Sequence, residues 1–111
     1  MFYTNSYGYR VKNWIETDET DPVKVIEKFY YDNCFIYDAD ICGDRSVEFA
    51  FEIDGKIEYY KLDYSWYIDY DPEWEIHNEF TIEKIEKPKT RFPANRDWLI
   101  LSKVFLPSLP D

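Results

Sequence analysis

The sequence has few of the residues on which common cofactor and redox sites depend. Its 111 residues include one histidine, three glycines and two cysteines. Gly8, Gly43 and Gly55 lie far apart, which excludes a glycine-rich phosphate loop and a dinucleotide-binding fingerprint. Cys34 and Cys42 have seven residues between them, a spacing that fits neither a C-x-x-C redox motif nor a zinc site. We therefore expect no cofactor and no bound metal.

Long apolar runs are also missing. No stretch approaches the roughly 18 apolar residues of a membrane-spanning helix. The first residues, MFYTNS, lack the basic and apolar regions of a signal peptide, so we expect a cytoplasmic protein. The sequence contains no flexible linker and no repeat of fixed period. A hydrophobic content of 45% is enough for a packed core, and we predict a single domain over residues 1–111.

Basic residues are scarce, and the charge is distributed unevenly. Asp and Glu number 23 against 13 Lys and Arg, which gives a net charge of -10. Residues 38–83 hold 14 acidic and 3 basic side chains, whereas residues 84–105 hold 6 basic and 2 acidic ones. This balance disfavours direct binding to nucleic acid or to an anionic membrane. It favours a basic protein as the partner.

One segment has the pattern of a helix. Asp21 is followed by Pro22, which is the typical order of an N-cap carboxylate and a first-turn proline. Apolar residues then recur at helical spacing. We predict a helix over residues 22–32.

Another segment has the pattern of a β-hairpin. Residues 46–53 and 56–70 alternate apolar and polar side chains on either side of Asp54-Gly55. This dipeptide is a strong signal for a two-residue type I′ turn. Such a turn predicts the cross-strand pairs Phe49–Tyr60, Val47–Leu62 and Glu48–Lys61.

The remaining strands are less regular. They are predicted over residues 7–16, 34–39, 74–82 and 98–106. Tyr70 and Trp74 are predicted to face the core. The fold class is therefore α+β: an antiparallel sheet of about five or six strands, with one helix of residues about 22–32 packed on one face.

The clearest functional pattern lies on the outward face of the two strands that follow the hairpin turn. Acidic side chains alternate there with core residues, and charges in such an alternation recur about every 6.6 Å. Rows of fixed negative charge can imitate a phosphate backbone or dock on a groove lined by Lys and Arg. Trp14, Tyr59 and Tyr67 are also predicted to point outward, and exposed aromatic side chains often anchor interfaces. The predicted partner-binding residues are Asp63, Tyr67, Asp69, Asp71, Glu73, Glu75, Glu79 and Glu83, with His77 among them.

Other chemistries have less support. His77 could act as a general base beside a glutamate, with Cys34 or Cys42 as nucleophile, but no catalytic signature surrounds them. Residues 38–44 resemble the first half of an EF-hand calcium loop, yet an apolar residue stands where the bidentate glutamate is needed. The basic stretch of residues 84–96 is interpreted as a loop that forms salt bridges over the acidic sheet. We therefore predict no catalytic residues and no metal ligands.

The sequence favours a binding protein over an enzyme. We expect an acidic inhibitor that occludes the basic, nucleic-acid-binding surface of a partner protein, of the phage or mobile-element counter-defence kind. An immunity protein that neutralises a toxin such as a nuclease is the first alternative. A small enzyme that uses His77 and carboxylates is an alternative from another class. A structural or assembly protein would instead show a symmetric apolar interface.

Overall fold

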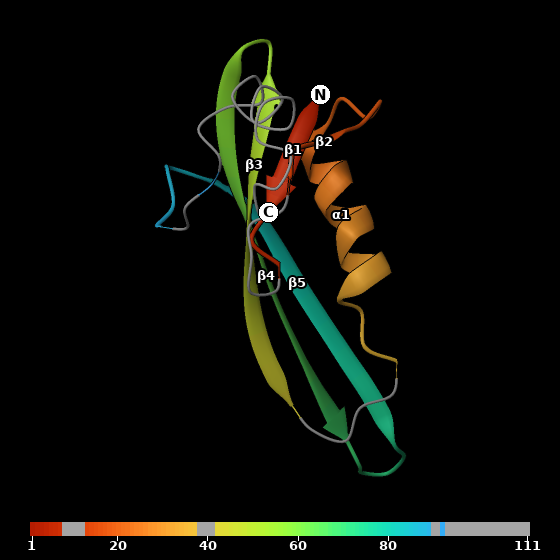
Figure 1. The fold of residues 1–111 in the computed structure, drawn as a ribbon. Helices are drawn as coiled ribbons and strands as arrows, with labels where there is room; N and C mark the ends of the chain where they lie inside the picture. Colours follow the sequence, from red (N-terminus) through yellow and green to blue (C-terminus); the bar gives the residue numbers. More distant parts are fainter. Residues whose placement is uncertain (8–12, 38–41, 90–91, 93–111) are drawn as a thin grey trace, which may run out of the picture.

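One antiparallel sheet and one helix make up the described part of the chain. The computed structural model describes residues 1–7, 13–37, 42–89 and 92. The elements are β1 (Phe2–Asn5), β2 (Ile15–Glu16), α1 (Pro22–Asn33), β3 (Gly43–Ile53), β4 (Lys56–Asp69) and β5 (Glu75–Ile85). The strand order is β2-β1-β3-β4-β5, and all neighbouring strands are antiparallel (Figure 1). This arrangement confirms the predicted α+β fold class.

Helix α1 begins where the sequence predicts. Asp21 is its N-cap, and the Oδ1 atom of this residue accepts the Val23 N–H at 3.0 Å. Pro22 occupies the first turn, where its missing N–H has no intrahelical partner to lose. The predicted range of residues 22–32 is confirmed to within one residue. The side chains that α1 buries are Val25, Ile26 and Tyr30.

The β3–β4 hairpin forms with the predicted register. Asp54 and Gly55 have φ angles of 51° and 80°, and a type I′ turn requires positive values at both positions. The turn fixes which residues lie opposite one another, so apolar side chains meet apolar ones across the strands. The observed pairs include Phe49–Tyr60, Val47–Leu62 and Glu48–Lys61.

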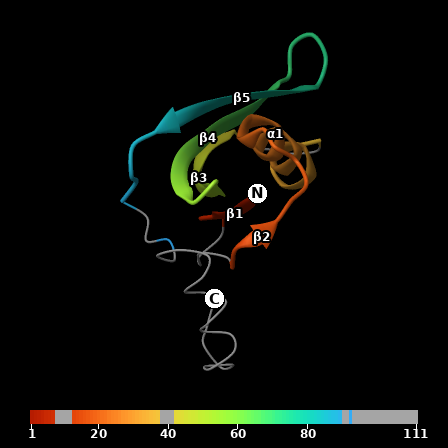
Figure 2. The ribbon, with the colours of Figure 1, turned by 90° about the horizontal axis from the view of Figure 1, so that it is seen from above.

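The sheet is curled, and α1 lies on its concave side (Figure 2). Phe49, Phe51 and Leu62 are completely buried in the core between them. Tyr30 of α1 stacks on Phe80 of β5, with ring centroids 4.2 Å apart. Successive side chains of a strand point to opposite faces. The odd-numbered residues of β3 and the even-numbered residues of β4 and β5 therefore form the concave face, and the intervening residues form the convex face.

The N-terminal strands differ from the prediction. Residues 8–12 of the strand predicted over 7–16 lie outside the described part of the chain, and among the described residues of that range Ile15–Glu16 form a strand. The strand beside β3 is instead β1, which the sequence reasoning did not identify. Thr4 and Asn5 of β1 are buried. Because these two buried residues are polar, β1 lacks the alternation by which strands are identified in a sequence.

The other three strand predictions have different outcomes. Residues 34–37 are not in a strand. The Ile36 N–H and carbonyl instead bond to the Asn78 side chain, at 3.1 and 2.8 Å. The strand predicted over residues 74–82 exists as β5, which begins one residue later and extends to Ile85. The strand predicted over residues 98–106 lies outside the described residues.

Three aromatic side chains occupy unexpected environments. Trp14, predicted to point outward, is buried against Ala50 on the convex face, in a small cluster that also contains Phe92. Tyr70 and Trp74, predicted to face the core, are 61% and 53% exposed. They lie in the connection between β4 and β5, past the end of α1 (Figure 1), so the helix does not cover them.

Candidate functional site

Strand pairing brings six of the eight predicted binding residues onto one face. Directly opposite residues of antiparallel strands point to the same side of a sheet. The cross-strand pairs of β4 and β5 include Lys61–Glu83, Asp63–Thr81, Ser65–Glu79, Tyr67–His77 and Asp69–Glu75. All of these side chains belong to the convex face, on the side of the sheet away from α1.

Asp71 and Glu73 do not continue the two strands, as the predicted alternation requires. β4 ends at Asp69 and β5 begins at Glu75, with a bend between them. Pro72 accounts for the break, because it has no N–H for the strand ladder and restricts the residue before it. The Asp69 Oδ1 atom accepts the Asp71 N–H at 3.1 Å, which stabilises the bend. Both predicted residues therefore lie exposed at the end of the hairpin.

Strand β3 adds a third row of polar residues that the sequence reasoning missed. Three cross-strand rows run from β3 to β5: Asp44–Ser65–Glu79, Ser46–Asp63–Thr81 and Glu48–Lys61–Glu83. Carboxylates alternate with hydroxyl groups in the first two rows and with the Lys61 ammonium group in the third. The hairpin register was the signal that could have identified the β3 residues, because it pairs each of them with a known residue of β4.

The spacing of charges also differs from the prediction. Glu75, Glu79 and Glu83 recur at every fourth residue of β5, with His77 and Thr81 between them. The carboxylates of this strand are therefore roughly 13 Å apart, twice the predicted repeat. Neighbouring strands supply the intervening charges, so the acidic surface is two-dimensional.

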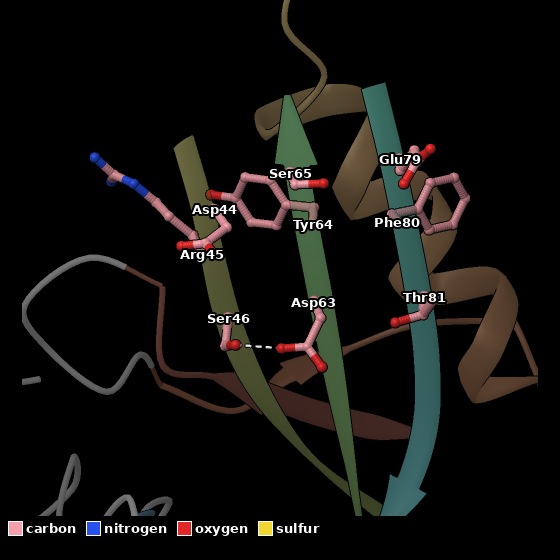
Figure 3. Close-up of a pocket in the computed structure, with 9 residues that line it drawn as sticks. All are labelled: Asp44, Arg45, Ser46, Asp63, Tyr64, Ser65, Glu79, Phe80 and Thr81. Carbon is pink, nitrogen blue, oxygen red and sulfur yellow. Dashed lines mark hydrogen bonds between the residues drawn. The ribbon is translucent and has the colours of Figure 1, made fainter. Parts of the chain in front are cut away.

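An open depression of about 590 Å³ lies among these rows (Figure 3). The residues that line it are Asp44, Arg45, Ser46, Asp63, Tyr64, Ser65, Glu79, Phe80 and Thr81. The Ser46 hydroxyl donates a hydrogen bond to the Asp63 carboxylate. Carboxylates and hydroxyls are hydrogen-bond acceptors for guanidinium and ammonium groups. The depression can therefore receive a basic side chain.

Lys61 is the single Lys or Arg on the convex face of β3, β4 and β5. Its Nζ atom lies 3.4 Å from Asp63 and 3.3 Å from Glu83. A hydrogen bond to Glu83 and the charge of Asp63 raise the pKa of Lys61 above its usual value. Asp44 and Glu79 form no ion pair with a Lys or Arg among the described residues. These two exposed carboxylates are therefore available to a partner.

His77 lies within the acidic surface, but its neighbours are not those of a catalytic site. Its Nε2 atom is 3.4 Å from the Glu75 carboxylate, and its ring stacks on Tyr67 with centroids 4.6 Å apart. Burial raises the pKa of the Cys34 thiol, the opposite of what an activated nucleophile needs. Cys42 is exposed. Within residues 1–7, 13–37, 42–89 and 92, no group of three His, Cys, Asp or Glu side chains could hold a metal ion.

The predicted aromatic anchors are only partly available. Tyr67 is 47% exposed on the convex face. Tyr59 points to the same face but is half-buried beside Phe92, and Trp14 is buried in the same cluster. Trp14 and Tyr59 therefore belong to packing, and the prediction that they are exposed anchors is wrong.

Comparisons with known proteins give no assignment: no family model, no curated protein and no solved structure matches the chain. No helix in the described part of the chain is both long enough and apolar enough to cross a membrane. The geometry and charge of the convex face are therefore the basis on which a function can be proposed.

Proposed function

We propose that this protein is an acidic inhibitor that binds the basic, nucleic-acid-binding surface of a partner protein and excludes nucleic acid from it. The proposed setting is the cytoplasm, and the proposed role is counter-defence by a phage or mobile element. The convex face of β3, β4 and β5 is the proposed contact surface. No catalytic step is part of the proposal.

The observation that carries the proposal is the charge of the convex face. Asp44, Glu48, Asp63, Glu79 and their neighbours stand in register on three paired strands, and Lys61 is the single Lys or Arg among them. Side chains on paired strands are held at fixed spacings, so little backbone conformational entropy is lost on binding. Exposed charges of one sign also attract a basic partner over a distance and accelerate its association.

A local conflict with stability supports the same proposal. Asp69 lies directly opposite Glu75 on the convex face, and like charges at such positions destabilise a sheet. The described residues provide no Lys or Arg ion pair for Asp69. A residue pair that destabilises the fold is expected at positions where the residue types serve binding and not folding.

Capture of the partner and displacement of nucleic acid together test this function. The protein is immobilised and exposed to lysate of its native host at low and at moderate salt, and bound proteins are identified by mass spectrometry. We expect a basic nucleic-acid-binding protein that is released as salt rises, because exposed charges are screened beyond roughly 8 to 10 Å at physiological ionic strength. A toxin among the captured proteins would identify the immunity alternative.

The captured partner is then purified and loaded with a labelled nucleic acid duplex. Addition of the acidic protein should release the duplex in proportion to complex formation. A ternary complex of partner, duplex and acidic protein would contradict the proposal, since the two ligands would then occupy different surfaces. Failure to capture any specific protein would also count against it.

A further inference from the structure

Three aromatic side chains at the end of the β4–β5 hairpin are not buried by the fold. Tyr67, Tyr70 and Trp74 are 47%, 61% and 53% exposed. We call them the aromatic tip. Tyr67 lies near the end of β4, and Tyr70 and Trp74 lie in the connection between β4 and β5. This end of the hairpin extends past the end of α1 (Figure 1), so the core ends before the tip begins. Exposed Tyr and Trp side chains are typical anchors of protein interfaces.

Carboxylates alternate with the rings of the aromatic tip. Residues 67–75 contain Asp69, Asp71, Glu73 and Glu75 and no Lys or Arg. Among the described residues, no Lys or Arg lies within ion-pair distance of these carboxylates, and the Glu75 carboxylate lies 3.4 Å from the His77 Nε2 atom. The tip therefore presents aromatic faces and unneutralised carboxylates together.

Tyr67 is held in place by its neighbour across the strands. The rings of Tyr67 and His77 are stacked, with centroids 4.6 Å apart and an angle of 11° between their planes. The next cross-strand pair toward the bend is Asp69–Glu75. Because strand pairing positions both pairs, a ring and two carboxylates are ordered before any partner arrives.

We propose that the aromatic tip binds arginine side chains of the partner, in preference to lysine. This inference rests on the proposed function and specifies the chemistry of the partner surface. A guanidinium group is planar, so it can stack on an aromatic ring and pair with a carboxylate through two parallel hydrogen bonds. An ammonium group is a compact, strongly hydrated charge that lacks this flat geometry. The combination of exposed rings and carboxylates without a Lys or Arg partner therefore favours a guanidinium group over an ammonium group.

Two labelled peptides of equal length and charge test the inference without the partner. One alternates glycine with arginine, and the other alternates glycine with lysine. Binding to the intact protein is measured by fluorescence anisotropy at low salt. We expect the arginine peptide to bind at least about threefold more tightly, because stacking of a cation on an exposed ring contributes modestly and Arg stacks better than Lys. Equal affinities would overturn the inference.

Two triple variants assign the preference to the tip. The variant with Tyr67→Ala, Tyr70→Ala and Trp74→Ala should bind both peptides equally, whereas the variant with Tyr67→Phe, Tyr70→Phe and Trp74→Phe keeps the rings and should keep the preference. Circular dichroism confirms that each variant is folded. Persistence of the preference in the alanine variant would overturn the assignment, as would concentration-dependent self-association of the wild type that the alanine variant abolishes. Since no partner is present, these results are independent of the displacement experiment that tests the inhibitor function.

Discussion

The concave and convex faces of the same sheet show how one set of strands can serve two purposes. On the concave face, Phe49, Phe51 and Leu62 are fully buried beneath α1. The convex face of the same strands carries carboxylates and hydroxyls opposite one another, with Lys61 as the single Lys or Arg among them. The two sets of side chains come from alternate residues of the same strands, because successive positions of a strand point to opposite sides.

The concave face contains the residues that stabilise the fold, and the convex face contains the residues proposed to contact a partner. Burial of apolar area on the concave face favours folding by roughly 1.5–3 kcal/mol for each large side chain. Like charges on the convex face oppose folding. Removal of a buried apolar side chain from the concave face and removal of a like-charged carboxylate from the convex face should therefore change stability in opposite directions. Substitutions at the aromatic tip should hardly change it.

The largest effect is expected in the core. Phe49→Ala should lower the free energy of unfolding by about 3–5 kcal/mol, because it leaves a cavity among buried rings. Phe49 lies between Phe29 and Phe51, with ring centroids 5.2 and 6.1 Å away. Urea unfolding followed by circular dichroism measures the change. Tyr70→Ala, at the exposed tip, is the control and should cost less than about 0.5 kcal/mol. Similar losses in the two variants would contradict the division between the faces.

A smaller effect of opposite sign is expected at Asp69. Asp69→Asn removes one charge of the like-charged Asp69–Glu75 pair and keeps the side-chain oxygen that accepts the Asp71 N–H. At low salt the variant should be more stable by about 0.2–1 kcal/mol, the usual range for a cross-strand pair. The gain should fade as salt is added. Glu27→Gln, on the exposed side of α1, should give no such gain, and a destabilised Asp69→Asn variant would show that the carboxylate serves the fold.

The smallest effect is expected at Lys61. Lys61→Met removes the single Lys or Arg of the convex face, so stability at neutral pH and low salt should fall slightly. Glu83 and Asp63 raise the Lys61 pKa above its ordinary value in the folded state. The stabilisation is therefore fully present below the ordinary lysine pKa and is lost as the pH rises through the higher folded-state pKa.

Unfolding in urea at neutral and at strongly basic pH tests this effect. The difference between Lys61→Met and the wild type should disappear at the basic end. Lys56→Met, next to the hairpin turn and with no ion pair among the described side chains, is the matched control. A pH-independent difference would mean that packing of the lysine stem, and not its charge, is responsible.

The parts of the fold that the sequence predicts are those with local signals. Asp54-Gly55 determines the hairpin register, and Asp21-Pro22 determines the start of α1. β1 could not be predicted in this way, because Thr4 is buried only through pairing with a strand distant in the sequence. Long-range pairing overrides local pattern at such positions.

The candidate site was predictable to the same extent. The period-two alternation placed Asp63 and Glu79 on one face, and the structure agrees. The burial of Trp14 could not be predicted, because it depends on contacts with Ala50 and other residues far along the chain. The exposure of Trp74 could not be predicted either, since alternation indicates a face but not where the covering helix ends.

The most direct test of the acidic surface is the affinity of the captured partner for a charge-reversed protein. The test variant carries the substitutions Asp69→Lys, Asp71→Lys, Glu73→Lys and Glu75→Lys. A control of equal net charge carries Glu16→Lys, Asp18→Lys, Glu27→Lys and Glu86→Lys, all at exposed positions outside the proposed surface. We expect the test variant to lose affinity by at least about a hundredfold and the control by far less, because charge reversal at an interface costs several kcal/mol. Equal losses in the two variants, or unchanged affinity of the test variant, would contradict the account.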